Sequence, residues 1–156
     1  MTTNFSSEHL IPEEELLPLI RERLAAGQRV RYLPFRGVSM MPMLRQGIDS
    51  VELAPLPHRL KKYDLPVYQY PSGKVVMHRI VKVAEDIYIC MGDNTYTPER
   101  IAPEQLIGIV SAFRRGEKRI EVTNLPYRIY CRFWVAIFPV RKFFVSAINW
   151  LRRHLK

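Results

Sequence analysis

The chain has 156 residues, of which 47% are apolar and 25% charged, and it carries a net charge of +9. This length predicts one principal domain, and the composition excludes wholesale disorder. The positive surplus predicts an anionic partner. In the last third of the chain the basic residues are interleaved with aromatic ones, which favours a membrane surface over nucleic acid.

The first segment, residues 1–27, is predicted to be helical. Leucines at helical spacing fill residues 12–26, acidic residues stand where the helix would begin, and Gly27 stands where it would end. The N-terminus has no basic start, no apolar run of signal-peptide length and no cleavage site of small residues. We therefore expect a cytoplasmic or peripherally membrane-associated protein.

The second segment, residues 28–122, is predicted to be a β domain. Residues 28–35 alternate as a strand does and end at the turn-prone RGVS. Five short β-branched or aromatic runs follow, separated by Pro, Gly and Asp: SVELAPL, LPVYQY, GKVVMHRIVKV, DIYICMG and QLIGIVSAF. The PSG at 71–73 predicts a hairpin with Gly73 at positive φ, which would pair the strand carrying His78 with LPVYQY. The fold class is therefore mainly β, with a short N-terminal helix.

The third segment, residues 123–156, is predicted to be basic, amphipathic and helical. Charges interrupt its apolar stretch before it reaches the roughly 18 to 20 residues that a spanning helix requires. Plotted on a helix, most of its basic residues fall on one side, and Pro139 would bend or break it. Residues 126–153 are thus expected to bind an anionic membrane surface, or alternatively to pack on the β domain. No specific nucleic-acid partner is expected.

Ser39 is the candidate nucleophile, in the phrase FRGVSMMPML. A serine on a tight turn needs a flexible and then a rigid backbone, which Gly37 and Pro42 provide. A plain turn serine is the alternative. Met40, Met41 and Met43 would line an adaptable apolar surface for substrate, or else pack in the core.

His78 is the candidate general base, because it interrupts the apolar strand VVMHRIV. A serine hydroxyl needs a neutral imidazole within hydrogen-bond reach to take its proton. Asp93, in YICMGDN, would hold the ring in its productive tautomer, or would simply form an Asx turn. Asp64 is a second acidic candidate for that role.

These phrases, in this order, resemble the signal peptidase I family in its serine and histidine branch, over about residues 34–115. GVSMMPML matches the serine box, VVMHRIV the box of the general base, YICMGDN the third box and LIGIV the closing strand. The resemblance implies a serine endopeptidase that acts on a peptide or protein. It implies Ser39 as nucleophile, His78 as base and Asp93 as acidic partner, with no metal and no cofactor.

The chain departs from the family pattern at three places. No N-terminal membrane helix is recognisable, the Gly-Asp after the serine box is stretched to Gly47-Ile48-Asp49, and Gly37 replaces a hydroxyl residue that assists the oxyanion. Two alternatives stay open. One is a catalytically inactive peptide-binding module on the same fold. The other is a relative of the self-cleaving repressors, for whose DNA-binding module residues 1–27 are too few.

Overall fold

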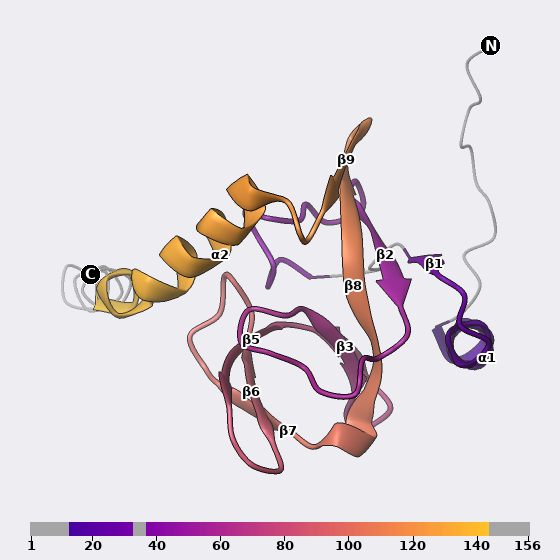
Figure 1. Ribbon diagram of the computed structural model, residues 1–156. Coiled ribbons are helices and arrows are strands. Elements are labelled where there is room, and N and C mark those ends of the chain that lie inside the picture. The colour runs from indigo at the N-terminus through magenta and orange to yellow at the C-terminus, as the bar shows by residue number, and fades with distance from the viewer. Residues whose placement is uncertain (1–12, 33–36, 144–156) are drawn as a thin grey trace, which may run out of the picture.

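The computed structural model describes residues 13–32 and 37–143, and predictions that fall on other residues lie outside this part. The chain is mainly β, with a short N-terminal helix and a helical C-terminal segment (Figure 1). Its elements in chain order are α1 (Glu13–Ala25), β1 (Val30–Tyr32), β2 (Ser50–Ala54), β3 (Pro66–Gln69), β4 (Val75–Met77), β5 (Arg79–Val83), β6 (Tyr88–Met91), β7 (Glu99–Ile101), the 3-10 helix η1 (Pro103–Gln105), β8 (Leu106–Arg115), β9 (Lys118–Glu121) and α2 (Leu125–Ala136).

The larger sheet is antiparallel and has the strand order β1-β2-β8-β3-β4, with β9 paired to β8. The long strand β8 runs through its middle (Figure 1). The predicted hairpin is confirmed: β3 pairs with β4, Val67 lies opposite Met77, and Gly73 in the turn has a φ of 87°. Gly27, after α1, has a φ of 76°, as a helix C-cap favours.

The smaller sheet has the order β5-β6-β7, and the chain enters it at His78. The sequence predicts one strand through GKVVMHRIVKV, and this prediction is wrong. Met77 pairs with Val67 in the larger sheet, whereas Arg79 pairs with Met91 in the smaller one. The backbone therefore leaves one ladder and joins the other at residue 78, so His78 belongs to neither strand.

Two apolar clusters hold these layers together. The first packs Ile20 and Leu24 of α1 against Leu53 and Val67 of the larger sheet. The second lies between the sheets and includes Tyr68, Ile80, Cys90 and Ile101, each of them fully buried. Burial of such side chains contributes about 25 cal/mol per Å² of apolar surface removed from water. The two sheets are therefore joined by apolar packing around the point where the chain crosses between them.

The helix α2 lies on the far side of the larger sheet from α1 and extends away from the β strands (Figure 1). It begins after Asn124, turns at Ile137 and continues as helix over residues 138–143. The predicted interruption beside Pro139 is thus present. In the described part of the chain, none of the helices combines the length and the apolar character that crossing a bilayer requires.

Candidate active site

Ser39 lies half-buried in a run of turns that leads from Gly37 to β2. Gly37 has a φ of 131°, a conformation that favours glycine. The N–H of Met41 donates to the carbonyl oxygen of Val38 (3.1 Å), which closes a turn around the serine. Met40 and Leu44 are buried in the first apolar cluster and fix this loop to the body of the protein. We call residues 37–44 the serine loop.

The GDN turn, residues 92–94 at the end of YICMGDN, packs directly on the serine loop. The N–H of Asn94 donates to the carbonyl oxygen of Ser39 (2.7 Å), and the Asn94 amide donates to that of Val38 (3.2 Å). Gly92 lies so close that a Cβ at this position would be 2.7 Å from the carbonyl oxygen of Ser39. The GDN turn therefore braces the backbone that carries the candidate nucleophile, and glycine is the residue that permits this approach.

His78 lies at the crossing between the sheets and is only 5% exposed. Its Nδ1 is 2.9 Å from Oε2 of Glu99 and 3.1 Å from Oη of Tyr68. The Tyr68 hydroxyl also donates to the Glu99 carboxylate. Since a carboxylate only accepts hydrogen bonds, we assign the ring proton to Nδ1. Nε2 is then the unprotonated nitrogen, which is the form that a general base needs.

The surroundings of Glu99 keep it ionised. Burial alone would raise the pKa of Glu99, but hydrogen bonds from Tyr68, Tyr70 and His78 outweigh it, and the pKa lies below its ordinary value. Burial, reinforced by Glu99, raises the pKa of Tyr70 to about 12 and that of Tyr68 further. Both phenols therefore remain protonated donors near neutral pH, so the carboxylate keeps its negative charge beside the imidazole.

Asp93 does not orient His78, which corrects the role that the sequence suggested for it. Its carboxylate accepts two parallel bonds from Arg79, at 2.8 and 2.7 Å, and both side chains are almost fully buried. The Tyr130 hydroxyl donates a third bond to it (3.0 Å). Among the described residues Asp64 has no bond to the imidazole either, and its carboxylate accepts the N–H of Lys61. The acidic neighbour of His78 is Glu99.

Ser39 and His78 are not hydrogen-bonded to each other: within the described residues, no bond joins Ser39 Oγ to the imidazole. Catalytic hydrogen bonds are often long in proteins without substrate and shorten when it binds. The structure thus gives each residue a defined local setting but does not show a formed pair.

The three methionines occupy different environments. Met40 is buried in the first apolar cluster, so the core-packing alternative applies to it. Met43 is also buried, with its Sδ 3.1 Å from Arg79 Nη2, whereas Met41 is 39% exposed. A groove of about 270 Å³ lies beside the serine loop. It is lined by residues of that loop, of β8 and β9 and of α2, among them Pro42, Met43, Phe113, Arg115, Lys118 and Tyr127.

Sequence reasoning missed Glu99, Tyr68 and Arg79. The sequence could have indicated Tyr68, because the predicted β3-β4 hairpin sets Tyr68 opposite Val76, two residues before His78. Glu99 depends on the pairing of β7 with β6, where it lies opposite Cys90, and nothing in TPERIAP marks a short strand. Arg79 adjoins His78 in the motif, but its burial depends on α2, which supplies Tyr127 and Cys131 as further partners.

A scan against models of known protein families gives no match to this chain, and a search for similar curated proteins finds no significant match.

Proposed function

We propose that this protein is a serine endopeptidase in which Ser39 is the nucleophile, His78 the general base and Glu99 the residue that orients the base. The observation that carries this proposal is the bond between His78 Nδ1 and Glu99, which leaves Nε2 as a proton acceptor. A serine on a loop braced by Asn94 supports it further. Carboxylate, imidazole and hydroxyl are the three groups that serine hydrolases combine.

The reaction would proceed in two halves. As Oγ of Ser39 bonds to the scissile carbonyl carbon, Nε2 of His78 takes the hydroxyl proton. The Ser39 N–H, to which the described residues offer no recorded acceptor, would stabilise the negative carbonyl oxygen. The proton then passes to the leaving amine as the C–N bond breaks. Water, deprotonated by His78, hydrolyses the acyl-serine and restores the hydroxyl.

The groove beside the serine loop suggests which peptides would bind. Phe113, Tyr127 and Met43 offer an apolar lining, and Arg115 and Lys118 add positive charge. Arg115 has only a distant ion pair, 3.9 Å from Asp49, which Arg45 already holds at 2.7 Å. A peptide with an apolar side chain next to an acidic group fits these surfaces.

Cleavage of a peptide library by the purified full chain, followed by mass spectrometry, tests the proposal. Ser39→Ala and His78→Ala should each abolish the products seen with the wild type, because groups that act as one unit fail singly. The matched controls are Ser72→Ala in the exposed hairpin turn and exposed His58→Ala, which should cleave as the wild type does. Full activity in Ser39→Ala or His78→Ala would contradict the mechanism.

A non-catalytic peptide-binding module is the second candidate function. The missing bond between Ser39 and His78 favours it, since a binding module has no need of that pair. It predicts that library peptides bind the wild type in calorimetry, that none is cut, and that Ser39→Ala leaves the affinity unchanged. Cleavage that depends on Ser39 excludes this alternative.

A further inference from the structure

The inner face of the helix α2 packs on and hydrogen-bonds to the β domain. Tyr127 and Cys131 are buried against Arg79, and the Trp134 ring N–H donates to the carbonyl oxygen of Asp93 (2.8 Å). Beyond the turn at Ile137, Phe138 stacks on Tyr96 with the ring centroids 5.8 Å apart. These contacts fix which side of the helix faces the β domain.

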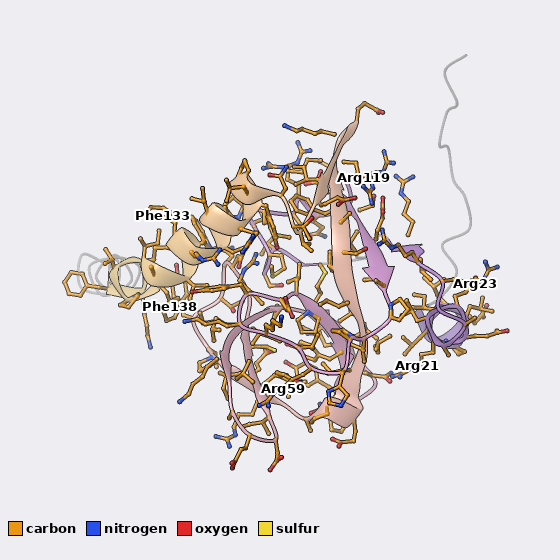
Figure 2. All side chains as sticks on the ribbon, viewed as in Figure 1. Arg21, Arg23, Arg59, Arg119, Phe133 and Phe138 are labelled. Atoms are coloured by element: carbon orange, nitrogen blue, oxygen red, sulfur yellow. The ribbon has the colours of Figure 1, made fainter. Side chains whose placement is uncertain are left out.

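The outer face of α2 is also apolar, but it faces solvent. Leu125, Ile129, Phe133 and Val140 are 64%, 57%, 59% and 55% exposed. Figure 2 shows Phe133 and Phe138 on different sides of the helix. At 100° per residue Leu125, Ile129 and Phe133 of α2 fall within an arc of about 80°, and Val140 is exposed beyond the turn at Ile137. We call them the outer stripe. A contiguous apolar face of this kind marks an interaction site, unlike single exposed apolar residues.

The segment that carries the outer stripe accounts for most of the net positive charge of the protein. Residues 122–156 contain seven Lys and Arg and no Asp or Glu, so this stretch accounts for seven of the nine net charges. In its described part, Arg128, Arg132 and Lys142 are exposed. On α2, Arg128 and Arg132 fall on one flank of the stripe, and Lys142 lies beyond the turn at Ile137. An apolar face bordered by cations, without acidic residues, is thus continuous over the outer side of α2.

An anionic lipid surface is the occupant that fits both features. A second copy of the chain would bring two acid-free cationic segments together, and their charges would repel. Nucleic acid would neutralise the cations but offers little apolar surface to cover the stripe. An in-plane helix buries its apolar face at the boundary between headgroups and acyl chains, and its basic residues meet the lipid anions.

We propose that the outer stripe of α2 binds flat on anionic lipid membranes, with Arg128, Arg132 and Lys142 at the headgroups, and does not cross them. This inference goes beyond the proposed peptidase activity and does not depend on it. Because the inner face of α2 bonds to the backbone of Asp93, within the GDN turn that contacts the serine loop, the lipid surface would hold that loop at a fixed orientation.

Vesicle flotation with the full chain tests the proposal. The wild type should float with vesicles of phosphatidylcholine and phosphatidylserine, remain at the bottom with phosphatidylcholine alone, and bind less as salt is raised. The affinity of the double variant Ile129→Gln/Phe133→Gln for these vesicles should be at least about tenfold lower, since two apolar side chains no longer insert into the lipid. Arg128→Gln/Lys142→Gln should lose the preference for anionic lipid. All four substituted side chains are exposed, and circular dichroism checks that the variants are folded.

The matched control is Leu19→Gln/Ile48→Gln, which removes two similarly exposed apolar side chains elsewhere, 52% and 62% exposed. It should bind vesicles as the wild type does. Equal binding by Ile129→Gln/Phe133→Gln and the wild type overturns the proposal. So does binding to neutral and anionic vesicles alike. A wild-type dimer in light scattering that the Ile129→Gln/Phe133→Gln variant abolishes, without vesicle binding, would assign the stripe to a second copy. If the protein binds a nucleic-acid column and does not bind vesicles, the basic residues of this segment serve a nucleic-acid partner and the proposal is overturned.

Discussion

Asp93→Asn should destabilise the fold strongly. This change replaces a carboxylate that accepts two bonds from Arg79 and one from Tyr130, all in the protein interior. Asn keeps the shape but not the charge, so the Arg79 guanidinium, which is fully buried, would lose its counter-ion. Breaking a buried pair in this way costs about 3–5 kcal/mol. That is a large share of the roughly 5–15 kcal/mol by which domains are stable.

Urea unfolding followed by far-ultraviolet circular dichroism measures this loss. Glu121→Gln is the matched control, because it makes the same carboxylate-to-amide change in a pair with Arg119 (2.8 Å) whose carboxylate is 54% exposed. It should change the free energy of unfolding far less, since surface pairs contribute little. Adding Arg79→Met to Asp93→Asn should recover part of the loss, because no unpaired charge then remains buried. Equal losses for Asp93→Asn and Glu121→Gln would refute the reasoning.

Two further predictions concern the site. The folded protein holds the pKa of Glu99 below its ordinary value, so Glu99 stabilises the fold above about pH 4.3, and this contribution is lost as the pH falls further. The stability gap between the wild type and Glu99→Gln should therefore be smaller at pH 3 than at pH 7 in thermal unfolding, and an equal gap at the two pH values would contradict this. Gly92→Ala should displace the serine loop and lower kcat/KM by up to about 100-fold. The control is Gly108→Ala, whose new Cβ would meet the flexible Leu24 side chain at 2.8 Å and the Ala54 carbonyl oxygen at 3.2 Å, but not the serine loop. It should lower kcat/KM far less than Gly92→Ala does, and equal losses in both variants would contradict the bracing role.

The sequence predicts the elements better than it predicts the contacts between them. The helix before Gly27, the hairpin at Gly73 and the mainly β class follow from local patterns, and the structure confirms them. The split at His78 could not be read in this way, because VVMHRIV is apolar on both sides of the histidine. Only the pairing of β4 and β5 with different partners breaks the strand there.

The candidate site shows the same limit. The motif predicts that Ser39 and His78 act together, with an acidic partner in the conspicuous GDN turn. The structure instead pairs Asp93 with Arg79, which is fourteen residues away in the sequence. Glu99 comes to His78 through the short strand β7, whose pairing no local pattern predicts. Partners that depend on tertiary pairing therefore escape a reading of one sequence.

The hydrogen bonds that α2 and the residues after it make with Arg79 and Asp93 form late during synthesis of the chain. The chain leaves the ribosome from its N-terminus, and Ser39, His78 and Glu99 all emerge before Tyr127, Trp134 and Arg141. Until those three arrive, Arg79 lacks the Tyr127 hydroxyl, and the Asp93 carbonyl oxygen lacks both the Trp134 and the Arg141 donors. The turn that braces the serine loop is then incomplete. Under the proposed function, the chain would therefore become competent to cleave peptides only after α2 has docked.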